Sequence, residues 1–201
     1  MCCRYWVDDS PELQPFVEAM NRSPLIERFV KEAAPNPSGE VRPTDIAPVV
    51  ALNKSGERRV FPMKWGFAGR SLLINARVET AAERPTFREA WQAHRCIVPA
   101  RGYFEWAHIA SGGERPRAGD KYLIRPRDGG MAWMCGLYRM EAGLPVFVIL
   151  TREAGAGIRF IHNRMPLMLP EALADAWIRP EAQPEALVAR AVADMYFERV
   201  A

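Results

Sequence analysis

The residue of this chain with the most distinctive chemistry is the cysteine at position 2. If Met1 is removed, Cys2 becomes the N-terminal residue and carries an α-amine and a thiol on adjacent carbons. An amine alone condenses with an aldehyde to an imine, which water reverses, whereas a neighbouring thiolate can add to the imine and close a thiazolidine ring. Unperturbed pKa values near ~8 for the amine and ~8.5 for the thiol leave both groups partly nucleophilic at neutral pH. Cys2 is therefore either an aldehyde-capturing group or an incidental residue on a frayed terminus.

Glu105 and His162 are the side chains best suited to moving protons. Glu105 stands between Phe104 and Trp106 in an aromatic, strand-like run. A carboxylate in such a run points outward to solvent, or it lies in a cleft where desolvation raises its pKa and suits it to proton transfer. His162, one of three histidines in the chain, is either a structural group or an acid/base catalyst. The residues alone leave both alternatives open.

Asn75 and Arg77 alternate along a predicted strand and therefore share one face of it. An asparagine amide can hydrogen-bond a sugar or carbonyl oxygen, and an arginine can bind phosphate through two parallel hydrogen bonds. The alternative for Arg77 is a surface ion pair.

Short helices are predicted at both ends of the chain, with one more between the strands. Ser-Pro and Pro-Glu pairs mark helix starts, apolar spacing marks the buried faces, and residues 86–89 match a capping box. The predicted helices run from Ser10 through Met20, from Ser23 to before Pro35, from Thr86 through Trp91, from Pro170 through Trp177 and from Pro184 through Met195.

The middle of the chain is dominated by predicted strands. Runs rich in Val, Ile, Phe, Tyr and Trp are separated by glycine-containing turns. These runs cover residues 46–52, 58–67, 71–79, 95–105, 121–126, 131–140 and 145–151. The pattern predicts the α+β class: one β-rich domain over residues 1–201, with a barrel-like curled sheet and peripheral helices.

Composition and net charge exclude few classes of function. The chain has 201 residues, 49% hydrophobic and 25% charged, which is typical of a globular domain that buries its own core. Its net charge of +3 and pI of 8.8 fall just short of the basic balance, a pI above about 9, that is common among nucleic-acid binders. Charge alone leaves DNA binding a minority hypothesis.

The four cysteines form neither a CxxC pair nor a disulfide framework, which favours a reducing cytoplasm. Cys2 and Cys3 with a histidine lack the usual spacing of zinc ligands, so no metal or other cofactor is expected. No signal peptide and no apolar stretch of about 20 residues is present, and no polybasic segment supports palmitoylation of the two adjacent cysteines. We expect no membrane association.

Several short motifs occur in a fixed order from residue 2 to about residue 170. They include Met1-Cys2-x-Arg4-Tyr5, Trp65-Gly66-Phe67, Asn75-Ala76-Arg77-x-Glu79-Thr80, Gly102-Tyr103-Phe104-Glu105-Trp106 and His162-x-Arg164-Met165-Pro166. Together they resemble the SRAP (SOS response-associated peptidase) family. The chain departs from the family at position 3, where Cys replaces the common Gly, at position 45, where Asp replaces Gln, and in a shortened segment before Asn75.

The resemblance implies action on abasic sites in single-stranded DNA, whose open-chain sugar offers an aldehyde. By this resemblance, Cys2 would supply both atoms that bond to C1′. Glu105 would act on the α-amine and assist opening of the sugar, and His162 would be the acid/base at the sugar oxygen. Asn75 would hold the N-terminus or the sugar in place.

The resemblance also suggests which residues bind DNA. Arg77 would bind the flanking phosphate, with Arg4 as a further phosphate ligand. Trp65 and Trp106 would be platforms on which neighbouring bases stack, an interaction of about 1–3 kcal/mol per base.

The implied activity is that of an autopeptidase that removes Met1 and then crosslinks to abasic DNA in the damage response, with possible lyase activity. A cellular aminopeptidase could equally expose Cys2. We expect a cytoplasmic monomer that associates with the nucleoid when it binds DNA. Two alternatives stay open: a thiol peptidase acting on other proteins through Cys2, His162 and Asn75, and a non-covalent binder of single-stranded DNA.

Overall fold

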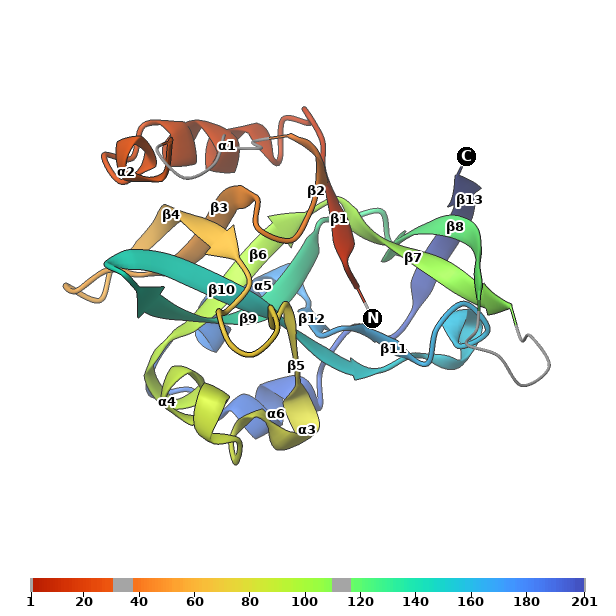
Figure 1. Cartoon of the computed structure of the whole chain (residues 1–201). Helices are drawn as coiled ribbons and strands as arrows, with labels where there is room; N and C mark the ends of the chain where they lie inside the picture. Colours follow the sequence, from red (N-terminus) through yellow and green to blue (C-terminus); the bar gives the residue numbers. More distant parts are fainter. Residues whose placement is uncertain (1, 31–37, 110–116, 201) are drawn as a thin grey trace.

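The computed structural model describes residues 2–30, 38–109 and 117–200. The predicted α+β class and the curled, barrel-like sheet are confirmed (Figure 1). The elements in chain order are β1 Arg4–Val7, α1 Gln14–Asn21, α2 Ile26–Val30, β2 Gly39–Val41, β3 Ile46–Leu52, β4 Arg58–Trp65, β5 Asn75–Arg77, α3 Val78–Ala81, α4 Pro85–Ala93, β6 Arg95–Ala100, β7 Gly102–Ile109, β8 Arg117–Pro126, β9 Ala132–Glu141, β10 Leu144–Glu153, the 3-10 helix η1 Ala156–Ile158, β11 Arg164–Pro166, β12 Met168–Leu169, α5 Glu171–Trp177, α6 Pro184–Val188 and β13 Met195–Val200.

Five strands close into a barrel in the order β10-β4-β3-β6-β9, because β9 also pairs with β10. The pairing of β4 with β10 is parallel, and the other four pairings are antiparallel. Strand β10 extends beyond the closed part, where it pairs with β5 and β11. This extension brings two chain segments with candidate site residues to one end of the barrel.

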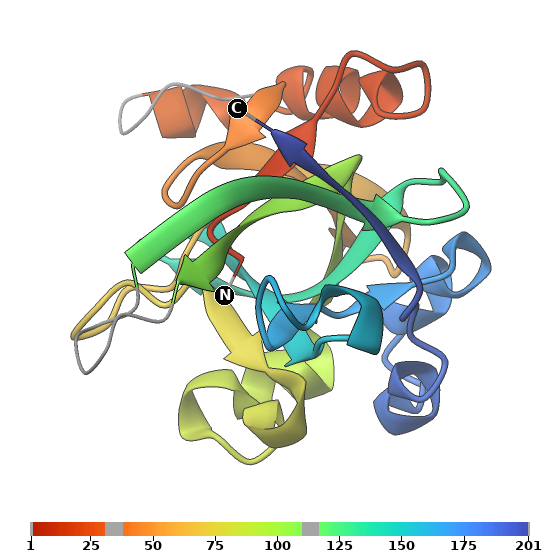
Figure 2. The same ribbon diagram turned by 90° about the vertical axis from the view of Figure 1, so that its right-hand side faces the viewer.

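A second, antiparallel sheet has the order β13-β8-β7-β1-β2 and carries both the N-terminal strand and Glu105. Figure 2 shows the chain from the side on which the N-terminus lies. There the beginning of the chain before β1 and the segment containing η1 and β11 lie side by side in front of the barrel, and the two are also neighbours in Figure 1. This is the end of the barrel reached by the extension of β10.

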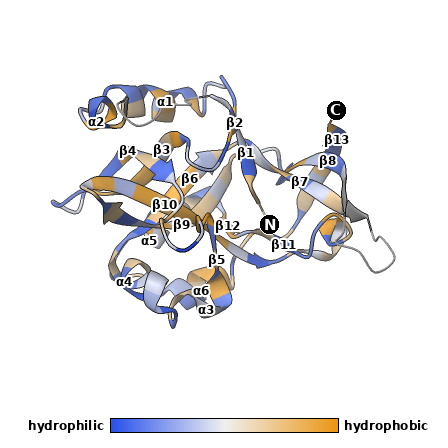
Figure 3. Ribbon diagram, viewed as in Figure 1, coloured by the Kyte–Doolittle hydropathy of each residue, from blue (hydrophilic) through white to orange (hydrophobic). Residues whose placement is uncertain are grey.

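The barrel strands are buried on both faces, which explains their nearly continuous apolar sequences. Val49 and Cys96 belong to one apolar cluster, whereas their neighbours Val50 and Ile97 belong to another that packs against α4 and α5. Successive strand residues point to opposite faces, so the two clusters line the inside and the outside of one wall. Figure 3 shows the resulting concentration of hydrophobic residues along β10.

The predicted helices α1, α2, α4 and α5 are present, but three of them start differently from the prediction. Helix α1 begins at Gln14 and not at Ser10, and α2 begins at Ile26 and not at Ser23. Helices α2 and α5 lie within the predicted segments, and α1 ends one residue beyond its segment, at Asn21; residues 31–34 of the second prediction lie outside the described residues. Helix α4 begins at Pro85 after Arg84, without a side-chain cap. The predicted capping box at residues 86–89 is therefore wrong: proline has its φ preset for the first helical position and starts the helix instead.

Three predicted boundaries are wrong. Helix α6 ends at Val188, and the chain then forms β13, whose β-branched and aromatic residues pair with the edge of β8. The predicted strand over 71–79 is limited to β5 and leads directly into α3. The run over 95–105 is two strands, β6 and β7. The second begins at Gly102, where only glycine fits because a Cβ there would lie 2.5 Å from the Ile124 carbonyl oxygen on β8.

Candidate active site

Cys2 is held at the end of the barrel by Asn75. The Asn75 side-chain amide donates a 2.7 Å hydrogen bond to the Cys2 carbonyl oxygen, and Asn75 itself is fixed by the pairing of β5 with Ile149 on β10. The Cys2 side chain is 1% exposed, and its Sγ lies 3.4 Å from the Arg4 carbonyl oxygen. The predicted proximity of Cys2 and Asn75 is thus present, and the amide positions the backbone that carries the thiol.

Glu105 faces inward and is only 4% exposed. Burial, and then the Glu105 carboxylate, raise the pKa of the Cys2 thiol well above its usual value, and the same two causes raise the pKa of Cys3. Both thiols are therefore close to Glu105 and protonated at neutral pH. Of the two orientations left open by the sequence, the structure selects the buried one.

Tyr103 and Tyr5, which belong to the motifs but have no predicted role, complete the buried surroundings of Cys2. Burial, followed by the proximity of Cys2, raises the pKa of both phenols well above the usual value. Their hydroxyl oxygens have no hydrogen-bond partner among the described residues. Tyr103 could have been found from the sequence, because it lies two residues before Glu105 and so shares its strand face.

His162 follows η1 and is oriented by the next turn of the chain. Its Nδ1 accepts a 2.9 Å hydrogen bond from the backbone N–H of Arg164. In the neutral ring the proton is then on Nε2, which can donate it to a bound molecule. The ring is half-buried, as expected of a group that must reach both protein and solvent.

Arg164 links three elements of the site. Its guanidinium binds both carboxylate oxygens of Glu79 at 2.8 Å and the Thr151 carbonyl oxygen at 2.7 Å. These hydrogen bonds from Arg164 lower the pKa of Glu79 from its usual value. The bidentate pair fixes α3 against β11 and so supports the backbone that orients His162.

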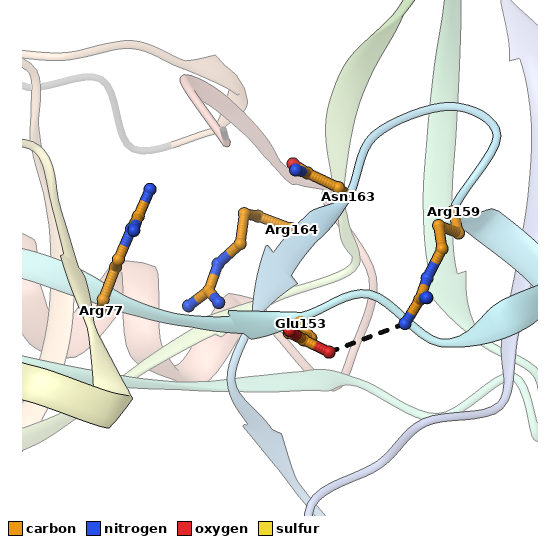
Figure 4. Close-up of a pocket in the computed structure, with 5 residues that line it drawn as sticks. All are labelled: Arg77, Glu153, Arg159, Asn163 and Arg164. Atoms are coloured by element: carbon orange, nitrogen blue, oxygen red, sulfur yellow. Dashed lines mark ion pairs between the residues drawn. The ribbon is translucent and has the colours of Figure 1, made fainter.

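A pocket of about 340 Å³ opens beside this pair and is lined by Arg77, Glu153, Arg159, Asn163 and Arg164. Figure 4 shows Arg77 and Arg164 next to each other, with Arg159 on the far side of Glu153. The Arg159 and Glu153 side chains form an ion pair at 3.7 Å. Arg164 pairs with Glu79 and Arg159 pairs with Glu153, so the third guanidinium, that of Arg77, gives the pocket a net positive charge that favours an anion such as phosphate. We call this the arginine pocket.

Arg4 and Trp106 both lie near Lys121, a residue that the sequence did not suggest as part of the site. Arg4 Nε pairs with Glu40 at 2.9 Å, and Lys121 pairs with the same carboxylate. The Lys121 ammonium lies 4.2 Å from the ring centroid of Phe104 and 5.5 Å from that of Trp106. Trp106 is half-buried.

The structure contradicts one predicted DNA-binding residue. Trp65 is 0% exposed, stacks at 6.2 Å on Phe147, contacts Tyr5 at 5.1 Å and donates its indole N–H to the Ile74 carbonyl oxygen at 2.9 Å. No part of the ring can reach a nucleotide base, so Trp65 is a core residue. The sequence could not separate the two roles, because a tryptophan suits both.

Membrane spans and metal clusters are both lacking in the described residues. No helix in these residues is long and apolar enough to cross a membrane. Among the same residues, no group of three or more His, Cys, Asp or Glu side chains is placed to hold a metal ion.

Comparisons with known proteins agree with this fold. A family model described as SOS response associated peptidase (SRAP) matches residues 1–200. The abasic site processing protein YoqW of Bacillus subtilis (strain 168) is 26% identical over 194 residues, covering 90% of this chain and 81% of that protein. The abasic site processing protein YedK of Escherichia coli (strain K12) is 35% identical over 159 residues, covering 73% and 68%. The solved structure of a phage-related protein from Bordetella bronchiseptica shares the fold, with a TM-score of 0.75 at 21% identity over 99% of this chain and 94% of that one.

Proposed function

Because the chain belongs to the SOS response associated peptidase (SRAP) family, we propose that it processes abasic sites in single-stranded DNA by crosslinking to them through Cys2. The observation that carries the proposal is the placement of Asn75 and Glu105 around the Cys2 segment. The description of similar proteins as abasic site processing proteins supports the substrate. The arginine pocket supports a negatively charged polymer as the ligand.

The reaction begins with hydrolysis of the peptide bond between Met1 and Cys2. This step consumes one water, releases methionine and exposes the α-amine of Cys2. The Cys2 thiol, Glu105 and His162 are the groups available for hydrolysis by the chain itself. Asn75 holds the Cys2 carbonyl oxygen on the product side of this bond at 2.7 Å, so the new N-terminus stays in place.

The free amine then attacks C1′ of the open-chain sugar, and one water leaves as the imine forms. His162 Nε2 donates a proton to the sugar oxygen as the ring opens. Glu105 accepts a proton from the attacking amine and gives it to the carbinolamine hydroxyl, which leaves as the water, so Glu105 is again a carboxylate. Glu105 next takes the proton of the Cys2 thiol, the sulfur adds to the imine carbon, and the nitrogen is protonated. The balance is one aldehyde, one amine and one thiol giving one thiazolidine and one water.

The surrounding residues hold the DNA. The arginine pocket takes a phosphate next to the lesion, with Arg77 as the exposed ligand. Trp106 stacks on a base on the side where Lys121 and Arg4 supply further positive charge. These contacts need an unpaired strand, because a base can stack on a side chain only where it is free of its own partner.

Intact-protein mass spectrometry with and without an abasic oligonucleotide tests the proposal. The protein should have lost Met1 and should gain the mass of the oligonucleotide less one water. Cys2→Ala should give no adduct, and Cys2→Ser should give at best a labile imine, since a hydroxyl closes the ring poorly at neutral pH. A stable Cys2→Ser adduct would exclude the thiazolidine. Cleavage of other proteins by a form that retains Met1 would favour a thiol peptidase, and binding without any adduct would favour a non-covalent binder.

A further inference from the structure

An exposed aromatic ring, Phe160, lies beside the candidate site and has no part in the mechanism above. Phe160 is 59% exposed. Its ring centroid lies 6.1 Å from that of Tyr122, at an interplanar angle of 85°, and 5.2 Å from that of Phe197, at 70°. Such edge-to-face contacts hold a ring in a defined orientation. We call these three residues the Phe160 cluster; a ring that is both held and exposed is suited to binding a flat partner.

The Phe160 cluster is continuous with the candidate site across the second sheet. Glu105 on β7 pairs with Tyr122 on β8, and Tyr122 pairs with Arg199 on β13. Residues directly opposite on neighbouring strands share a face and have Cβ atoms about 4.5–5.5 Å apart. Tyr122 therefore stands next to Glu105, and Phe160 is separated from Glu105 by this one side chain.

The chain around Phe160 joins the cluster to two other parts of the site. Arg159, the preceding residue, lines the arginine pocket, and His162 follows two residues after Phe160. Cα atoms two residues apart are separated by at most about 7 Å. One short segment thus presents a phosphate ligand, an aromatic ring and an acid/base group, which are the groups needed to bind the phosphate, base and sugar of adjoining nucleotides.

Charge around the cluster identifies the kind of partner. The side chains of Arg159 and Arg199 are 62% and 70% exposed, and each also forms one surface ion pair. A second copy of this chain, docked on the cluster by a two-fold axis, would bring these guanidinium groups close to the same groups of the first copy, and the like charges would repel. A nucleic acid strand meets them with phosphate and covers the ring with a base.

We propose that Phe160 is a stacking platform for one base of the DNA, that of the nucleotide joined to the abasic sugar through the phosphate in the arginine pocket. The inference rests on the proposed function and adds a residue that determines how the strand leaves the lesion. Because every base has a flat apolar face, the platform accepts any neighbouring base.

Affinity measurements on single-stranded oligonucleotides with one central tetrahydrofuran test this platform, because that analogue has no aldehyde and cannot crosslink. Phe160→Ala should weaken binding about 5- to 150-fold, the equivalent of one base–aromatic stack of about 1–3 kcal/mol. Phe160→Trp should restore it. Met140→Ala, which removes another 59% exposed side chain at the far β9–β10 hairpin, should bind as the wild type does.

A second set of oligonucleotides locates the base. Replacing the nucleotide on one side of the lesion, 5′ or 3′, with a further tetrahydrofuran should abolish the effect of Phe160→Ala, because no base is left to stack. Wild-type affinity for Phe160→Ala, or the same loss with and without either neighbouring base, would overturn the inference. So would a concentration-dependent wild-type dimer that Phe160→Ala dissociates without changing DNA affinity. Adduct formation on a true abasic oligonucleotide reports separately on the proposed function, which fails if the wild type forms none.

Discussion

At the scale of single residues, the candidate site places the buried Cys2 thiol close to Glu105. Burial and the nearby Glu105 carboxylate raise the pKa of the Cys2 thiol, so the group is protonated and little reactive until a base removes its proton. His162 is oriented through its Nδ1, and in the proposed reaction its Nε2 donates the proton to the sugar oxygen. Reactivity in this site therefore depends on proton transfer more than on a preformed thiolate.

Glu105→Gln and His162→Ala should slow adduct formation more than they weaken binding. General acid/base groups contribute about 10²–10⁴-fold to rate, and these two act in the transition state. Each variant should lose at least the lower end of that range in single-turnover experiments at saturating abasic DNA. Affinity for the tetrahydrofuran oligonucleotide should stay near that of the wild type. Normal rates combined with lost affinity would make both residues structural parts of the binding surface.

The pH dependence of Cys2 alkylation should reveal the influence of Glu105. In a Cys3→Ser background, labelling of Cys2 by iodoacetamide should be slow at neutral pH and rise with alkaline pH, because only the thiolate reacts. Glu105→Gln removes a like charge and should move the midpoint of this rise to lower pH. Peptide mapping by mass spectrometry gives the rate at each pH. A midpoint unaffected by the substitution would place Glu105 too far from the thiol to act on it.

At the scale of elements, β10 organises the site although its own sequence is mainly apolar. Beyond the closed barrel it pairs with β5, which carries Asn75, and with β11, which follows His162. Helix α3 continues directly from β5, and its Glu79 forms an ion pair with Arg164 on β11. The polar groups are thus positioned by strands that pair with a buried neighbour.

Glu79→Gln removes the ion pair with Arg164 and should lower the free energy of unfolding at neutral pH but not in acid. The Glu79 side chain is 46% exposed, so the loss of unfolding free energy should be at most about 1 kcal/mol. Because Arg164 lowers the pKa of Glu79, its stabilising effect is fully present above the ordinary carboxyl pKa of about 4.3 and is lost as pH falls through the lowered value. Urea unfolding of both proteins across this range measures the difference. A difference that persists in strong acid would show that the substitution acts by another route.

At the scale of the whole molecule, charge is concentrated locally while the total stays small. The chain has 27 Lys and Arg against 24 Asp and Glu, which by itself predicts little about DNA. Three arginines nevertheless gather in one pocket, and Lys121 lies against Phe104 and Trp106 on the neighbouring sheet. The local field and the exposed rings, and not the net charge, should determine binding.

Arg77→Ala and Trp106→Ala should weaken binding to single-stranded DNA in distinguishable ways. Loss of one phosphate contact should reduce the dependence of log K on log salt concentration by about 0.7. Trp106→Ala should lower affinity by the roughly 1–3 kcal/mol of one stacked base with the salt slope unchanged. Titrations at several salt concentrations separate the two effects. If both variants bind as the wild type does, the DNA lies on another face.

Much of this protein follows from its sequence. The order of the motifs around Cys2, Asn75, Glu105 and His162 identified the family, which the match over residues 1–200 confirms. Apolar runs such as 46–52 predicted the barrel strands closely, because a strand buried on both faces must be apolar throughout. Proline before an apolar stripe likewise predicted α5. These features depend on local composition and spacing, which the chain carries itself.

Other features required the tertiary structure. Glu105 faces inward and Trp65 is buried because of what packs on each strand, and a strand's own sequence does not say which face meets the core. The segment Met195–Val200 forms a strand because the edge of β8 offers hydrogen-bond partners that no local signal reveals. The arginine pocket and the Phe160 cluster join residues far apart in the chain. Spacing in sequence determines which residues share an element, whereas contacts between elements are fixed only when strand pairing brings those elements together.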